Sequence, residues 1–174
     1  DPPRHAEQRR TVAPIVAPQN LRNMEATIRA HTLEVLDALP RGETFDWVAH
    51  VSIELTTMML ATLFDFPWED RRLLTYWSDV AIANLDAPNP IVATEEARMA
   101  ELDKMGDYFR DLFDERAKAA PKFDLISMLA HNESTKNMPQ RELVGNVALL
   151  IVGGNDTTRN SMSGGVLALN ENPA

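Results

Sequence analysis

The chain has 174 residues, enough for one domain with a sizeable core, and its 44% hydrophobic and 25% charged residues are an ordinary globular balance. The formal net charge of −9 argues against a nucleic-acid partner, because affinity for phosphates depends on Lys and Arg neutralising them. The absence of cysteine excludes disulfides, cysteine-zinc sites, iron–sulfur clusters and thiol nucleophiles within these residues.

The chain shows neither a leader segment nor a membrane span in its pattern. Its first residues lack the charged-then-apolar order of a signal peptide. Its longest uninterrupted apolar run, residues 147–152, is far too short to cross a bilayer. We therefore expect a cytoplasmic protein. Because the sequence opens on Asp1 and closes just after Pro173, we expect residues 1–174 to be a single partial domain, truncated at both ends.

The first half of the chain predicts a series of helices. Asp1 can cap a first helix that runs to Val12, and Pro14 and Pro18 interrupt it. Further helices are expected at residues 19–39, 48–66 and 68–85, where apolar residues recur at helical spacing and prolines mark the ends. Residues 42–47 are either a turn or a short strand.

The second half continues in the same way. Residues 86–94 contain two prolines and predict a loop, and a long amphipathic helix follows at residues 95–119. A short helix is expected at residues 125–131. The histidines His31, His50 and His131 are isolated, without metal-ligand spacing, so we interpret them as structural and expect no metal ligand here. The predicted fold class is mainly α.

The last helix, from Pro139 to Glu171, is unusually long and contains two pairs of glycines. Four glycines in a helix interior cost roughly 4 kcal/mol relative to alanine, so this segment has two interpretations. In one, residues 153–158 form a loop, with Asp156 or Thr157 capping a new helix. In the other, the helix is continuous and its glycines let something large and flat approach the backbone.

The continuous interpretation also predicts a local hydrogen bond. The Thr157 hydroxyl can donate to the carbonyl of Gly153, four residues earlier, which loosens or bends a helix. The result would be a notch in the helix beside the carboxyl of Asp156 and the hydroxyl of Thr157.

Several segments resemble one family. Residues 149–158, Leu-Leu-Ile-Val-Gly-Gly-Asn-Asp-Thr-Thr, resemble the oxygen-binding motif in the long central helix of cytochromes P-450. Asp-Pro-Pro-Arg-His at residues 1–5, followed by Arg9, resembles the start of the family's heme-edge helix. Residues 52–57, 63–68 and 159–162 look like the soluble bacterial branch that hydroxylates alkanes and fatty acids at their chain ends.

The sequence departs from the family pattern at two points. Val16-Ala17-Pro18 replaces the family's Phe-Ser-Pro or Phe-Thr-Pro after the first helix. The family's Glu-x-x-Arg helix and its heme-ligating Cys loop are expected beyond Ala174. The resemblance therefore implies the central segment of the fold, from the heme-edge helix through the oxygen-binding helix, which by itself should be inactive.

The resemblance also implies a cofactor and a set of site residues. The cofactor would be heme, whose iron is held by a thiolate that promotes O–O cleavage. Asp156 and Thr157 would be the catalytic pair that controls protons. The cofactor-binding residues implied by the resemblance are His5, Arg9, Gly153 and Gly154, of which His5 and Arg9 share a helix face and would contact the heme propionates.

The implied substrate-binding residues are Leu149, Val152 and Gly153, one or two turns before Thr157 on a similar face. They would form an apolar wall suited to a hydrocarbon chain. Plain core packing is an equally good interpretation of Leu149 and Val152. The loop at residues 86–94 corresponds to the family's mobile lid, or is an ordinary connector.

The implied partners are a hydrophobic small molecule, dioxygen, and a ferredoxin with its ferredoxin reductase. Arg4, Arg9 and Arg10 form a basic cluster that could belong to a docking face for an acidic ferredoxin, although for Arg4 and Arg10 a solvated helix surface explains the charge as well. The competing function comes from a different class, an all-α interaction or ligand-sensing module without redox activity.

Overall fold

The computed structural model describes residues 3–172, and these contain α-helices and no β-strands. The helices are α1 (Arg4–Val12), α2 (Pro18–Asp37), α3 (Ile53–Phe64), α4 (Arg72–Ala81), α5 (Glu95–Lys118), α6 (Leu125–His131) and α7 (Gln140–Glu171). Short 3-10 turns at Ala13–Val16 and Trp68–Asp70 and a π turn at Val48–Ser52 complete the regular structure. The mainly α prediction is confirmed.

The starts of three helices follow from single residues. Pro18 is the first residue of α2, where its missing N–H costs no helical hydrogen bond. The side chains of Thr94 and Asp124 cap α5 and α6 by accepting from the N–H groups of Ala97 and Ser127. The predicted cap Asp1 lies outside the described residues. Residues 42–47 form no strand, so the turn alternative is correct there.

One helix boundary differs from the prediction. The helix expected to continue to Leu85 ends at Ala81, and residue 82 leaves helical geometry with φ −104° and ψ 9°. Two hydrogen bonds stabilise the turn that follows: Arg98 of α5 donates to the carbonyl of Ala83, and the Asn84 side chain accepts from the N–H of Asp86. Side-chain bonds of this kind compete with helix continuation.

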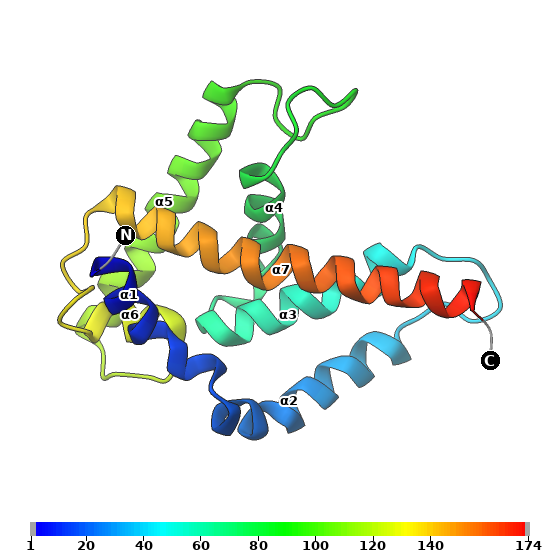
Figure 1. Ribbon diagram of the computed structural model, residues 1–174, viewed down its shortest axis with the longest axis horizontal. Coiled ribbons are helices and arrows are strands. Elements are labelled where there is room, and N and C mark those ends of the chain that lie inside the picture. The colour runs from blue at the N-terminus through cyan, green and yellow to red at the C-terminus, as the bar shows by residue number, and fades with distance from the viewer. Residues whose placement is uncertain (1–2, 173–174) are drawn as a thin grey trace.

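The last helix is continuous. α7 contains 32 residues and keeps helical geometry through both glycine pairs, so the continuous interpretation is confirmed and the loop at residues 153–158 is wrong. Figure 1 shows α7 along the long axis of the molecule, with α3 beside it and α4 and α5 rising on one side. α1 and α6 lie together at one end.

The main core lies where α3, α4, α5, α6 and α7 meet. Its centre is a cluster of aromatic rings with neighbouring centroids 5.1 to 6.5 Å apart, contributed by Phe64, Phe66, Trp77, Tyr108 and Phe109. α5 crosses α7 closely at Gly106, where an added Cβ would lie 2.6 Å from a methyl group of Val144. A side chain at that crossing would force the helices apart.

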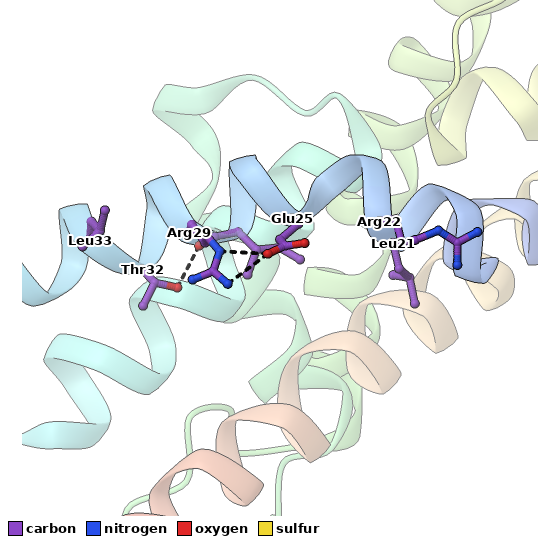
Figure 2. Close-up of a pocket in the computed structure, with 7 residues that line it drawn as sticks. Leu21, Arg22, Glu25, Arg29, Thr32 and Leu33 are labelled. Atoms are coloured by element: carbon purple, nitrogen blue, oxygen red, sulfur yellow. Dashed lines mark hydrogen bonds and ion pairs between the residues drawn. The ribbon is translucent and has the colours of Figure 1, made fainter.

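Two helices, α2 and α7, have apolar side chains that remain exposed. On α2, Leu21, Ile28 and Leu33 are exposed and border a shallow hollow lined by residues of that helix alone (Figure 2). On α7, Leu167 and Leu169 are exposed near the end of the helix. Among the described residues, no helix is both long and apolar enough to cross a membrane.

We predict that Phe109→Ala lowers the free energy of unfolding by about 3–5 kcal/mol, because Phe109 is 1% exposed and its removal leaves a cavity inside the aromatic cluster. The matched control is Phe123→Ala, since Phe123 is 58% exposed and its loss should change stability by less than about 0.5 kcal/mol. Urea denaturation of the two variants measures the difference. Equal losses would contradict this description of the core.

Candidate functional site

The exposed face of α7 contains three of the predicted site residues. Leu149, Gly153 and Thr157 follow one another at four-residue intervals, so their positions lie along one side of the helix. The predicted bond is present, with the Thr157 hydroxyl donating to the Gly153 carbonyl over 2.9 Å. Leu149 is 68% exposed, so core packing does not explain it. Val152 is half-buried.

This face of α7 lies opposite α1 across an apolar groove. One part of the groove, about 370 Å³, is lined by Arg9 of α1 together with Leu149, Gly153 and Gly154 of α7. A second part, about 230 Å³, is lined by His5, Arg9 and Leu149. Residues of α1 and α7 that lie far apart in the sequence therefore border the same groove. Asp156, Thr157 and Val152 line neither part.

The two adjacent glycines have different surroundings. A Cβ added at Gly153 would meet no atom within 4 Å, so the backbone there borders open space. A Cβ added at Gly154 would lie 2.8 Å from a methyl group of Leu60 on α3. Gly154 therefore allows α3 and α7 to pack closely, and Gly153 leaves the groove open to something that approaches the helix.

α1 is held in place by its own polar contacts. Arg4 and Gln8 both donate to the carboxylate of Glu142 in the first turn of α7. Arg10 donates to the carbonyl of Ala6 in its own helix. Arg4 is thus engaged within the fold. Between residues 3 and 172, Arg9 takes part in no ion pair, although it borders the groove.

Asp156 is bound in a network that the sequence did not reveal. Its Oδ1 accepts from Arg159 Nη2 over 2.7 Å, and its Oδ2 accepts from Asn160 over 3.3 Å. Arg159 Nη1 also donates to Asp79 of α4 over 3.0 Å. The spacing of Asp156 and Arg159, three residues apart on a helix, was a signal for their pairing. Nothing in the sequence indicated Asp79, which lies 80 residues from Arg159.

Partial burial of Arg159 works against its charge, yet hydrogen bonds and charge from Asp156 and Asp79 hold its pKa above the ordinary value. The guanidinium is therefore charged at every pH at which the protein is folded. Asp156 stands beside a permanent positive charge.

Asn155 anchors the same stretch of α7 to α3. Its side chain is fully buried, and its Oδ1 accepts from the Thr56 hydroxyl over 2.8 Å. Eight residues further along α7, Ser163 shares a 2.9 Å hydrogen bond with Ser52. These contacts fix the rotation of α7 about its axis, which turns the face with Gly153 toward the groove.

The three isolated histidines and the loop at residues 86–94 lie outside the groove. His31 stacks on Trp68, His50 contacts the carbonyl of Asp46, and His131 contacts Ser127. These contacts agree with the interpretation of the three histidines as structural. Residues 86–94 form part of the connection between α4 and α5, seen at the top of Figure 1.

No protein-family model matches the chain. It is 30% identical to linalool 8-monooxygenase of Pseudomonas putida and 31% identical to cytochrome P-450 109 of Bacillus spizizenii, covering 99% and 98% of this chain. Its fold superposes on a cytochrome P-450 of group 153 from Novosphingobium aromaticivorans with a TM-score of 0.85, at 51% identity over 98% of this chain and 40% of that one. The chain belongs to the cytochrome P-450 family. A second similar structure, CYP153D17 from a Sphingomonas species, is 49% identical with a TM-score of 0.82, over 97% of this chain and 42% of that one.

This cytochrome P-450 chain spans 42% and 43% of the two curated relatives. Cytochromes P-450 bind heme, and the groove between α1 and α7 fits the edge of such a group. It is apolar, it borders the side-chain-free backbone of Gly153, and it carries Arg9, whose charge suits a propionate. These 174 residues contain no cysteine, so the thiolate ligand of the iron is not among them.

The contrast between the glycines gives a prediction for adjacent positions. Alanine raises helix propensity by about 1 kcal/mol at either site. At Gly154 the new methyl group collides with the Cδ2 methyl of Leu60, and because Leu60 is 2% exposed in the core and has little room to turn away, overpacking costs about 1–3 kcal/mol. Thermal denaturation should therefore find Gly154→Ala less stable than Gly153→Ala by about 1–3 kcal/mol. Indistinguishable melting curves would argue against the close packing at Gly154.

Proposed function

We propose that the whole protein is a heme-dependent monooxygenase that hydroxylates a hydrophobic substrate, with the terminal carbon of medium-chain alkanes or fatty acids as its target. Electrons would come from a ferredoxin and its reductase, and the location would be cytoplasmic. The observation that carries the proposal is the groove where Arg9 of α1 and Gly153 of α7 meet. The resemblance of residues 52–57 and 159–162 to the alkane and fatty-acid branch supports the substrate class, as does the similarity to group 153.

When bound, a heme thiolate would activate dioxygen for insertion of one oxygen atom into a C–H bond. The residues of this chain would bind and orient that group. Arg9 and His5 lie one turn apart on α1, and both border the groove from the same side. A guanidinium and an imidazole N–H in these positions would donate to the two carboxylates of a heme edge.

Thr157 and Asp156 are proposed to control protons. The Thr157 hydroxyl donates its one hydrogen bond to the Gly153 carbonyl. Its oxygen can therefore still accept a hydrogen bond from a water molecule beside the helix. Rotation of the hydroxyl would turn the same group into a donor. Asp156, one residue earlier, would take up protons from solvent and pass them to that water.

Leu149 and Gly153 are proposed to bind the substrate, whereas the predicted Val152 is half-buried and lines neither part of the groove. The exposed side chain of Leu149 and the bare backbone at Gly153 give this face of α7 an apolar, shallow surface. A saturated chain lying there would lose contact with water at little steric cost. A pure interaction module would not need an acid and a hydroxyl beside such a surface, and the family of the chain favours the enzyme.

The assignment of protons predicts the effect of Thr157→Ala. Substrate binding, followed by the spectral change on titration, should stay within about twofold, because the Thr157 hydroxyl does not contribute to the apolar wall. Product formed per reducing equivalent should fall by at least about tenfold, with the remainder appearing as peroxide or water. Thr158→Ala, a neighbouring exposed threonine, serves as the matched control. Equal coupling in Thr157→Ala and the parent enzyme would refute the role.

The proposed cofactor site has a separate test. The whole protein should show the carbon-monoxide-shifted band of a ferrous heme thiolate. Arg9→Leu should weaken heme retention by about 1.5–3 kcal/mol, because a charge-assisted hydrogen bond is lost, and transfer of heme to an apoprotein acceptor measures this loss. Arg10→Leu is the control, since Arg10 donates along its own helix. A whole protein without the band would rule out the proposed function.

A further inference from the structure

Arg159 lies between α4 and α7, and the proposed reaction has given it no role. Its guanidinium contacts Asp156 of its own helix through Nη2, and Asp79 of α4 through Nη1. Only 13% of the side chain is exposed, compared with 25% for Asp156 and 34% for Asp79. The three side chains thus form a bridge between α4 and α7, with the most buried member in the middle.

The charges of this bridge explain why the middle position needs arginine. Two carboxylates flank one guanidinium, so the group keeps a net negative charge even when it is complete. A planar guanidinium presents separate N–H donors to each carboxylate at once, which the single ammonium of lysine does less well. Without Arg159, the two carboxylates would face each other across the same gap without compensation.

The carboxylate of Asp156 has little freedom while the bridge holds. Arg159 takes Oδ1 and Asn160 takes Oδ2, so both oxygens are engaged by side chains of the same helix. The backbone beneath is fixed as well, because neighbouring Asn155 is buried and bonded to Thr56 of α3. Removal of Arg159 would therefore release the carboxylate more than it would move the helix.

We propose that Arg159 is a positioning residue that holds the Asp156 carboxylate for proton exchange, and that Asp79 makes this hold depend on where α4 lies. The inference rests on the proposed function. Because Asp79 lies on α4 and Arg159 on α7, a displacement of α4 relative to α7 would move Asp79 away from the guanidinium. The guanidinium of Arg159 would then bind the carboxylate of Asp156 alone. The position of α4 would thereby affect how firmly the carboxylate of Asp156, the acid that exchanges protons, is held.

The test uses the heme-loaded whole protein and the substitutions Arg159→Met, Arg159→Lys and Asp79→Asn. Arg159→Met should lower the product formed per reducing equivalent by about tenfold, as expected when a group that supports proton transfer is lost. The substrate dissociation constant should change by less than about twofold, since Arg159 does not line the groove. Arg159→Lys should recover part of the loss, and Asp79→Asn should give an intermediate value.

A second readout does not depend on activity. The melting temperatures of Asp79→Asn, Arg159→Met and the double variant form a cycle that isolates the contact between the two side chains. We expect the double variant to lose less than the sum of the single losses. Additive losses would overturn the bridge itself.

The outcomes separate the inference from the function on which it rests. If the parent enzyme hydroxylates its substrate and Arg159→Met couples equally well, the positioning role is wrong and the proposed function stands. If the parent protein lacks the heme-thiolate band, the proposed function fails and the inference fails with it. If Arg159→Met does not fold, Arg159→Lys and Asp79→Asn decide, because unchanged coupling in both would refute the role.

Discussion

A helix of 32 residues with five glycines in its interior depends on its neighbours for stability. Relative to alanine, the glycines cost roughly 5 kcal/mol, which is a large part of the net stability of a domain of this size. The contacts that compensate come from every side. α3 supplies Leu60 against Gly154 and a hydroxyl for Asn155, α4 supplies a carboxylate for Arg159, and α5 crosses closely enough to require glycine at residue 106. Continuity of α7 is thus a tertiary property.

The same contacts divide α7 into two sides. The side with Asn155 and Ile151 is buried against α3 and its neighbours, and it is fixed by packing and by the hydrogen bond from the Thr56 hydroxyl to Asn155. The opposite side, with Leu149 and Gly153, faces the groove and has few atoms near it. A rigid support on one side keeps the backbone straight where its other side is open. That arrangement suits a surface that has to receive a flat cofactor without collapsing onto itself.

Much of this was predictable from the sequence because the signals were local. Helix spacing and prolines located the helices to within a few residues, and the bond from Thr157 to Gly153 followed from their separation alone. The end of α4 at Ala81 was missed, because Arg98, fifteen residues from the carbonyl it bonds, stabilises the turn. The packing role of Gly154 and the partner of Arg159 were also missed. Both depend on how α3 and α4 are placed against α7, which no nearby residue encodes.

The attachment of α1 has a consequence for the evolution of the groove. Two side chains of α1, Arg4 and Gln8, converge on the single carboxylate of Glu142, while His5 and Arg9 point to the groove from the same short helix. Glu142 therefore acts as a common pivot, and its substitution would free both restraints in one step. A substitution at Glu142 alone would thus change the width of the opening, and Arg9, Leu149 and Gly153, which border it, would stay the same.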